Sequence, residues 1–106
     1  MKLTELRALL DTMAIQVKYR AFKVGEAPNL PYILFYKEDN QGTLKADNQN
    51  YAKVSNVTIE LYSDEKDIEL EEQLESILDT NEIEYDTYES YLDTESMYEV
   101  AYDITI

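Results

Sequence analysis

The chain has 106 residues, an apolar content of 44% and a formal net charge of -14 at neutral pH. This length fits one domain, which we place at residues 1–106, and the apolar content, with ten tyrosines, is sufficient for a hydrophobic core. The absence of cysteine and histidine excludes disulfides, conventional zinc or haem sites, and catalysis by Ser/His or Cys/His pairs.

The first predicted element is an amphipathic helix over Lys2–Met13, with Thr4 as a possible N-cap. We expect its apolar side to pack on a sheet of the same domain, and an exposed partner-binding helix is the alternative. The side chains that form this apolar side recur at helical spacing and are Leu3, Leu6, Leu9, Leu10 and Met13.

The next segment, Ala14–Leu30, has an irregular pattern interrupted by Gly25 and Pro28, which fits a strand or an extended arm that leads into a loop. Its cations beside aromatic residues leave three interpretations open: a solvated loop, a contact with an acidic protein surface, or a nucleic-acid patch. These residues are Lys18, Tyr19, Arg20, Phe22 and Lys23.

Two strands follow. Tyr32–Tyr36 is a short aromatic and β-branched run, which predicts a strand buried on both faces. Lys37–Asn50 is a polar loop, and Val54–Tyr62 alternates as a half-buried strand does, with Val57, Ile59 and Leu61 on the core side.

A second helix is expected to begin with Ser63 or Asp64 as its N-cap and to stop at a left-handed Asn81. Its buried stripe consists of Leu70, Leu74, Ile77 and Leu78. Its acidic residues are expected to form mostly a solvated face, and they are Glu69, Glu71, Glu72, Glu75 and Asp79.

The C-terminal part is expected to form two strands. Tyr85–Tyr91 also fits a helix, but tyrosine and threonine favour a strand, and Tyr98–Ile106 alternates clearly. The predicted fold class is α+β in the order α-β-β-α-β-β, an antiparallel or mixed sheet with two helices packed on one face.

The sequence gives no indication of an enzyme, a cofactor or a metal site. Most acids alternate with core residues and therefore point to solvent, whereas acid/base catalysis needs carboxylates in distinct, partly buried environments. The loop around Gly42 resembles a calcium-binding loop only in its glycine, because Lys37 and Asn48 occupy ligand positions that require carboxylates.

A series of short motifs runs along the whole chain and resembles the tail terminator, or tail completion, family of long-tailed bacteriophages and prophages, whose members are also called minor tail or minor capsid proteins. The order and spacing of the motifs carry the resemblance. The motif positions are Pro31, Tyr32, Ala46, Asp47, Asn48, Tyr51, Glu60, Leu61, Tyr62, Lys66, Asp67, Glu95, Met97 and Tyr98.

The resemblance implies a structural virion protein with no catalytic or cofactor residues. It implies a ring, of six subunits, at the head-proximal end of the tail, which stops tail-tube polymerisation and joins tube to head connector. The implied partners are other copies of the chain, the tube protein and the connector, and the protein would be made in the bacterial cytoplasm. The alternatives are a head-completion or connector protein and an acidic DNA mimic that inhibits a host defence enzyme.

Charge is distributed unevenly along the chain. Residues 1–53 hold eight basic and six acidic side chains, whereas residues 54–106 hold Lys66 against seventeen acids. The acidic half would repel phosphate backbones, so we expect no direct nucleic-acid binding, and the longest apolar runs are far shorter than the roughly 20 residues of a membrane-spanning helix. A ring needs two complementary patches on each subunit, so the basic segment with Tyr19 and Phe22 is the candidate subunit interface.

Overall fold

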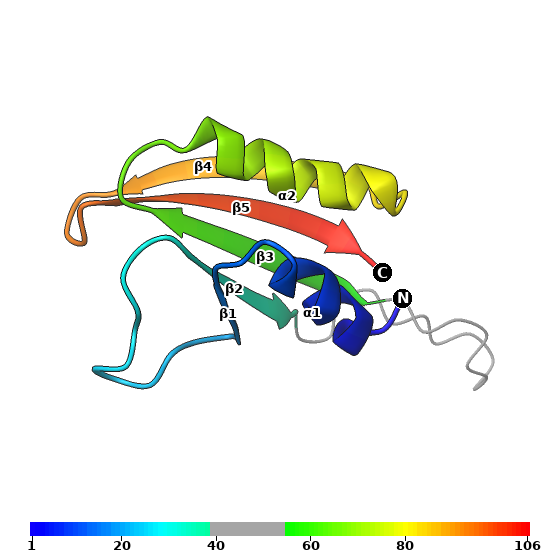
Figure 1. Cartoon of the computed structure of the whole chain (residues 1–106), viewed down its shortest axis with the longest axis horizontal. Coiled ribbons are helices and arrows are strands. Elements are labelled where there is room, and N and C mark those ends of the chain that lie inside the picture. Colours follow the sequence, from blue (N-terminus) through cyan, green and yellow to red (C-terminus); the bar gives the residue numbers. More distant parts are fainter. Residues whose placement is uncertain (39–54) are drawn as a thin grey trace.

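The computed structural model describes residues 1–38 and 55–106 and forms an α+β fold with a mixed sheet (Figure 1). The strands lie in the order β1-β2-β3-β5-β4, with β1 parallel to β2 and every other neighbouring pair antiparallel. The elements are α1 Leu3–Asp11, β1 Gln16–Tyr19, β2 Tyr32–Lys37, β3 Asn56–Ser63, α2 Ile68–Thr80, β4 Tyr85–Leu92 and β5 Met97–Thr105.

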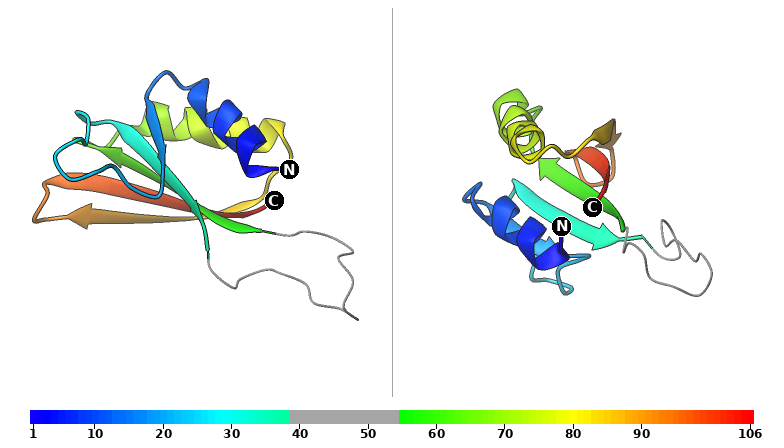
Figure 2. Two further views of the ribbon diagram at one scale, coloured as in Figure 1. Left: turned by 90° about the horizontal axis from the view of Figure 1, so that it is seen from below. Right: turned by 90° about the vertical axis from the view of Figure 1, so that its right-hand side faces the viewer.

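Both helices cover the same face of the sheet, and the other face, which we call the open face, carries no helix (Figure 2). The predicted fold class is therefore confirmed, with β1 as one strand more than the predicted order. That strand lies in the segment interpreted as a strand or extended arm, and only Val17 of its four residues is buried.

The core lies between the helices and the sheet. Cross-strand partners point to the same face, so the register stacks Ile33 on Leu61 and Val100, and Phe35 on Ile59 and Tyr102. Leu6 and Leu10 of α1 and Leu74 and Leu78 of α2, all without solvent exposure, close this layer from above. The side chains of β2 that alternate with Ile33 and Phe35 lie on the open face and are only partly buried. The prediction that this strand is buried on both faces is therefore wrong.

The helix boundaries differ from those expected. Lys2, not Thr4, precedes α1, and its backbone N–H donates to Glu5 at 3.0 Å. Asp67 caps α2 by accepting from the Leu70 N–H at 3.0 Å. Ser63 cannot serve as this cap because it is the last residue of β3.

The end of α2 also differs, because Asn81 has a φ of -95° and the left-handed residue is Glu82, with a φ of 57°. In the described parts of the chain, no helix is long and apolar enough to span a membrane. The motif positions Ala46, Asp47, Asn48 and Tyr51, like the start of the strand predicted at Val54, lie outside the described residues.

Candidate assembly surface

The described motif positions come from separate segments that meet at one end of the sheet. This end, which we call the hairpin end, contains the start of β2, the loop from β3 to α2 and the turn between β4 and β5 (Figure 1). Tyr32 is paired with Tyr62, with ring centroids 5.2 Å apart, and Tyr62 is paired with Glu99. Burial, then the charges of Glu60 and Glu95, raise the pKa of the Tyr32 phenol.

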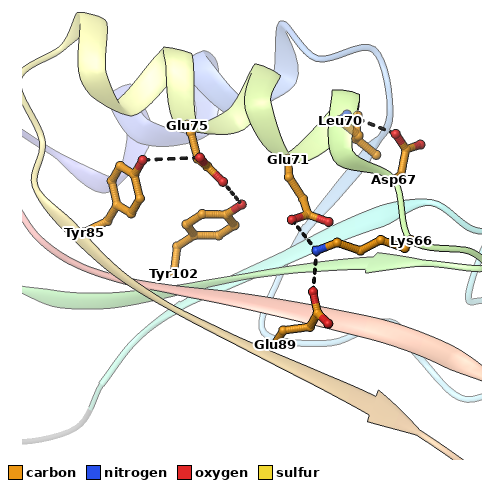
Figure 3. Close-up of polar contacts among 8 residues, drawn as sticks. All are labelled: Lys66, Asp67, Leu70, Glu71, Glu75, Tyr85, Glu89 and Tyr102. Atoms are coloured by element: carbon orange, nitrogen blue, oxygen red, sulfur yellow. Dashed lines mark hydrogen bonds and ion pairs between the residues drawn. The ribbon is translucent and has the colours of Figure 1, made fainter.

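Lys66, in the loop before α2, links α2 to β4 at the hairpin end. Its ammonium donates to Glu71 of α2 at 2.8 Å and also to Glu89 of β4, and the two hydrogen bonds raise its pKa (Figure 3). Glu71 is buried, and its Oε2 has no hydrogen-bond partner. The expectation of a solvated acidic face on α2 is therefore wrong at Glu71.

A second carboxylate of α2 also points inward. Glu75 accepts hydrogen bonds from the hydroxyls of Tyr102 at 2.8 Å and Tyr85 at 3.4 Å (Figure 3). Burial, followed by the hydrogen bond to Glu75, raises the pKa of Tyr102 strongly, so the phenol remains a donor at every physiological pH. The sequence held a signal for both acids, because Glu71 and Glu75 are four residues apart on the side of Leu74 and Leu78.

The open face carries a chain of tyrosines and carboxylates. Glu60 accepts from Tyr36 at 3.1 Å and from Tyr62 at 2.9 Å, and the Tyr62 hydroxyl also lies 2.8 Å from Glu99. Burial raises the pKa of Glu60, with the charge of Glu99 as a smaller cause, while the hydrogen bond from Tyr62 opposes the shift. Glu60 and Tyr62, both motif positions, therefore belong to a hydrogen-bond network within the chain.

The candidate interface residues fall into two groups. Tyr19 packs edge-on against Phe35 at 5.2 Å, and the guanidinium of Arg20 lies 5.0 Å from the centroid of the Tyr36 ring. Arg20 also donates to the Lys37 carbonyl at 3.2 Å, so this cation has a role within its own subunit. Lys18 is exposed on the open face beside these residues.

Phe22 and Lys23 lie in the arm, which we define as residues 20–31 between β1 and β2. Phe22 is half-buried and packs edge-on against Tyr32 at 5.1 Å, so it anchors the arm to the sheet. Lys23 is exposed, and Val24 beside it is fully exposed at 104%. Both aromatic residues expected to anchor a partner, Tyr19 and Phe22, thus contact the sheet of their own chain.

The polar side chains described above form contacts within the fold, and the exposed charges around them are available for binding. Within residues 1–38 and 55–106, no group of three acidic side chains is placed to hold a metal ion. The ordered polar contacts join strands to strands and helix to sheet, and the exposed charges form a basic β1 side and an acidic β4 side. A scan against models of known protein families found no match for this chain, and a search of curated proteins found no relative.

Proposed function

We propose that this chain is a structural subunit of a phage tail terminator ring, which caps the tail tube, stops its polymerisation and joins it to the head. The observation that carries the proposal is the separation of charge across the sheet. Lys18 and Lys23 are exposed at the β1 side, and Asp86 and Glu89 are exposed at the β4 side. Subunits placed side by side bring unlike charges together, as a heterologous, ring-closing interface requires.

The hairpin end supports the same proposal, because motif positions far apart in sequence meet there and are held in place by packing and ion pairs. Tyr32 and Tyr62 pack together, and Lys66 ties the loop before α2 to β4. A surface that binds a tube or connector ring benefits from such preorganisation, because less side-chain entropy is lost on binding.

The acidic character suits a passage for DNA. Carboxylates that line the opening of a ring repel phosphates and let DNA slide through, whereas a basic lining would hold it. This role needs no cofactor and no chemical step.

Tube growth provides the test. Purified chain is added to polymerising tail-tube protein from the same phage, and tube lengths and end-bound rings are examined by electron microscopy. The proposal predicts short tubes capped at one end. Uncapped tubes of normal length with binding to the connector alone would favour a head-completion protein, and binding to neither, with inhibition of a DNA-cleaving host enzyme, would favour a DNA mimic.

A further inference from the structure

The outward backbone carbonyls at the β1 edge of the sheet already accept hydrogen bonds. The Arg20 N–H points inward and donates to β2, so alternation turns the backbone groups of Val17 and Tyr19 outward. Arg7 donates to the Val17 carbonyl at 3.1 Å, and the Ala21 N–H donates to the Tyr19 carbonyl at 2.8 Å. A further strand at this edge would therefore find both of these carbonyls occupied.

The β4 edge is different, and the ladder identifies its outward groups. Ser55 and Ile106, which follows β5, exchange two backbone hydrogen bonds. Counting back from Ile106, every second residue of β5 therefore forms its backbone hydrogen bonds with β3. The intervening residues of β5 form their backbone hydrogen bonds with their register partners in β4. The other residues of β4 therefore point their N–H and C=O groups away from the sheet. These residues are Tyr85, Thr87, Glu89 and Tyr91.

The β4 strand is continuous, and the charged side chains on it are both acidic. Its eight residues pair with β5 in one uninterrupted register, and its sequence contains no proline, glycine or lysine. Its six central residues are exposed, including Tyr88 at 57% and Tyr91 at 50%. Proteins commonly protect such edges with bulges, prolines or charged side chains, above all lysines. The charges on β4 are the acids Asp86 and Glu89, so this edge favours a partner strand that brings a cation.

The arm offers backbone groups for such a pairing, up to the turn in which the Glu26 N–H donates to the Lys23 carbonyl at 2.9 Å. Within the described residues, the backbone N–H groups of Phe22, Lys23 and Val24 donate no hydrogen bond. Its lysine, Lys23, is opposite in charge to the exposed Asp86 of β4, whereas Glu89 already pairs with Lys66 of its own chain. Because Phe22 holds the arm against the sheet, little additional ordering is needed when it docks.

The arm cannot reach β4 of its own subunit. It leaves the sheet at β1, and four inter-strand spacings, roughly 19 Å, separate β1 from β4. Both the arm and the β4–β5 turn lie toward the left-hand end of the molecule in two perpendicular views, so neighbouring subunits placed side by side bring them level (Figures 1 and 2). Pairing between copies is then heterologous, which is the type of contact that a closed ring uses.

We infer that Phe22–Val24 of one subunit adds to the free edge of β4 in the next, so that each subunit donates an arm at one side and accepts one at the other. This contact rests on the ring proposed above and supplies its main-chain hydrogen bonds. Acidic β4 edges repel one another, which disfavours a symmetric β4–β4 dimer.

Thr87→Pro tests the edge, because proline removes an outward N–H that the subunit itself does not use. The variant should melt like the parent but require about tenfold more protein to assemble, as expected for the loss of one interface hydrogen bond. Thr87→Ala keeps the N–H and should assemble like the parent. Tyr91→Pro removes another outward N–H and replaces Thr87→Pro if that variant does not fold.

Carbodiimide cross-linking of a mixture of ¹⁵N-labelled and unlabelled chains tests the donor. The expected products are isotopically mixed peptides that join Lys23 to Asp86 or Glu89. If rings form and both proline variants assemble like the parent, or if no mixed Lys23 products form, this contact is wrong while the ring stands. A parent that remains monomeric at high concentration overturns both the contact and the ring.

Discussion

Glu75 joins α2 to two strands, because one carboxylate accepts from the hydroxyls of both Tyr102 and Tyr85. Tyr102 has no exposed surface, so Glu75→Ala leaves a buried hydroxyl unpaired and should cost about 1–3 kcal/mol of unfolding free energy. Adding Tyr102→Phe removes the unpaired hydroxyl and should recover part of that loss. Urea unfolding measures both variants, with the exposed Glu72→Ala as control, and a double variant less stable than Glu75→Ala contradicts the assignment.

Glu60 on the open face should make stability depend on pH. Burial raises its pKa in the folded state, so between its ordinary pKa and the raised value the folded protein binds more protons than the unfolded chain. Stability from this group therefore rises as pH falls through the raised pKa. Glu60→Gln should remove this gain while the exposed control Glu72→Gln keeps it, as measured by urea unfolding at pH 7 and pH 5.5. Equal pH responses in the two variants would contradict the burial of Glu60.

At the level of elements, the leucines of α2 hold the helix to the sheet. Leu74 has no exposed surface, and Leu74→Ala should cost about 2–5 kcal/mol, a large part of the roughly 5–15 kcal/mol typical of a whole domain. Ile68 of the same helix is 57% exposed, so Ile68→Ala is the matched control and should change little. Thermal unfolding compares the melting temperatures of the two variants. A Leu74→Ala variant with the melting temperature of the parent would contradict the packing of α2 in the core.

Periodicity in the sequence predicts the elements that bury one continuous face. It correctly places Leu74 and Leu78 of α2, Ile59 of β3 and Val100 of β5 in the core. It does not find β1, because four residues with Val17 as the single buried one give no repeat. It misplaces the N-cap of α2 because pairing with Tyr98 extends β3 through Ser63, and tertiary pairing of this kind overrides local capping preference.

The candidate surface was less predictable than the fold. Sequence places Lys18, Arg20 and Lys23 in one basic segment, but it cannot show that Arg20 lies over Tyr36 and serves its own subunit. The partners of Glu71 and Glu75 come from other elements, so no local pattern reveals them. Long-range partners of this kind depend on the register of the strands.

At the level of the whole molecule, the sheet has two unlike sides. The β1 side holds exposed cations and outward carbonyls that already accept hydrogen bonds. The β4 side holds exposed acids and outward backbone groups that the register leaves unpaired within the sheet. The ring proposed above would use these two sides in a heterologous contact, which closes into a ring when the rotation between neighbours allows it. The central claim is therefore that unlike charges drive assembly between neighbouring subunits.

Sedimentation velocity on charge-reversed variants tests this claim most directly. Lys18→Glu with Lys23→Glu reverses the exposed cations and spares Arg20, and the control pair Lys2→Glu with Lys37→Glu makes the same change in net charge at other exposed lysines. At low salt, where surface charges are least screened, the parent and the control should sediment as rings and the Lys18/Lys23 variant as a folded monomer. Rings formed by the Lys18/Lys23 variant at the parent's concentration and salt would contradict the account.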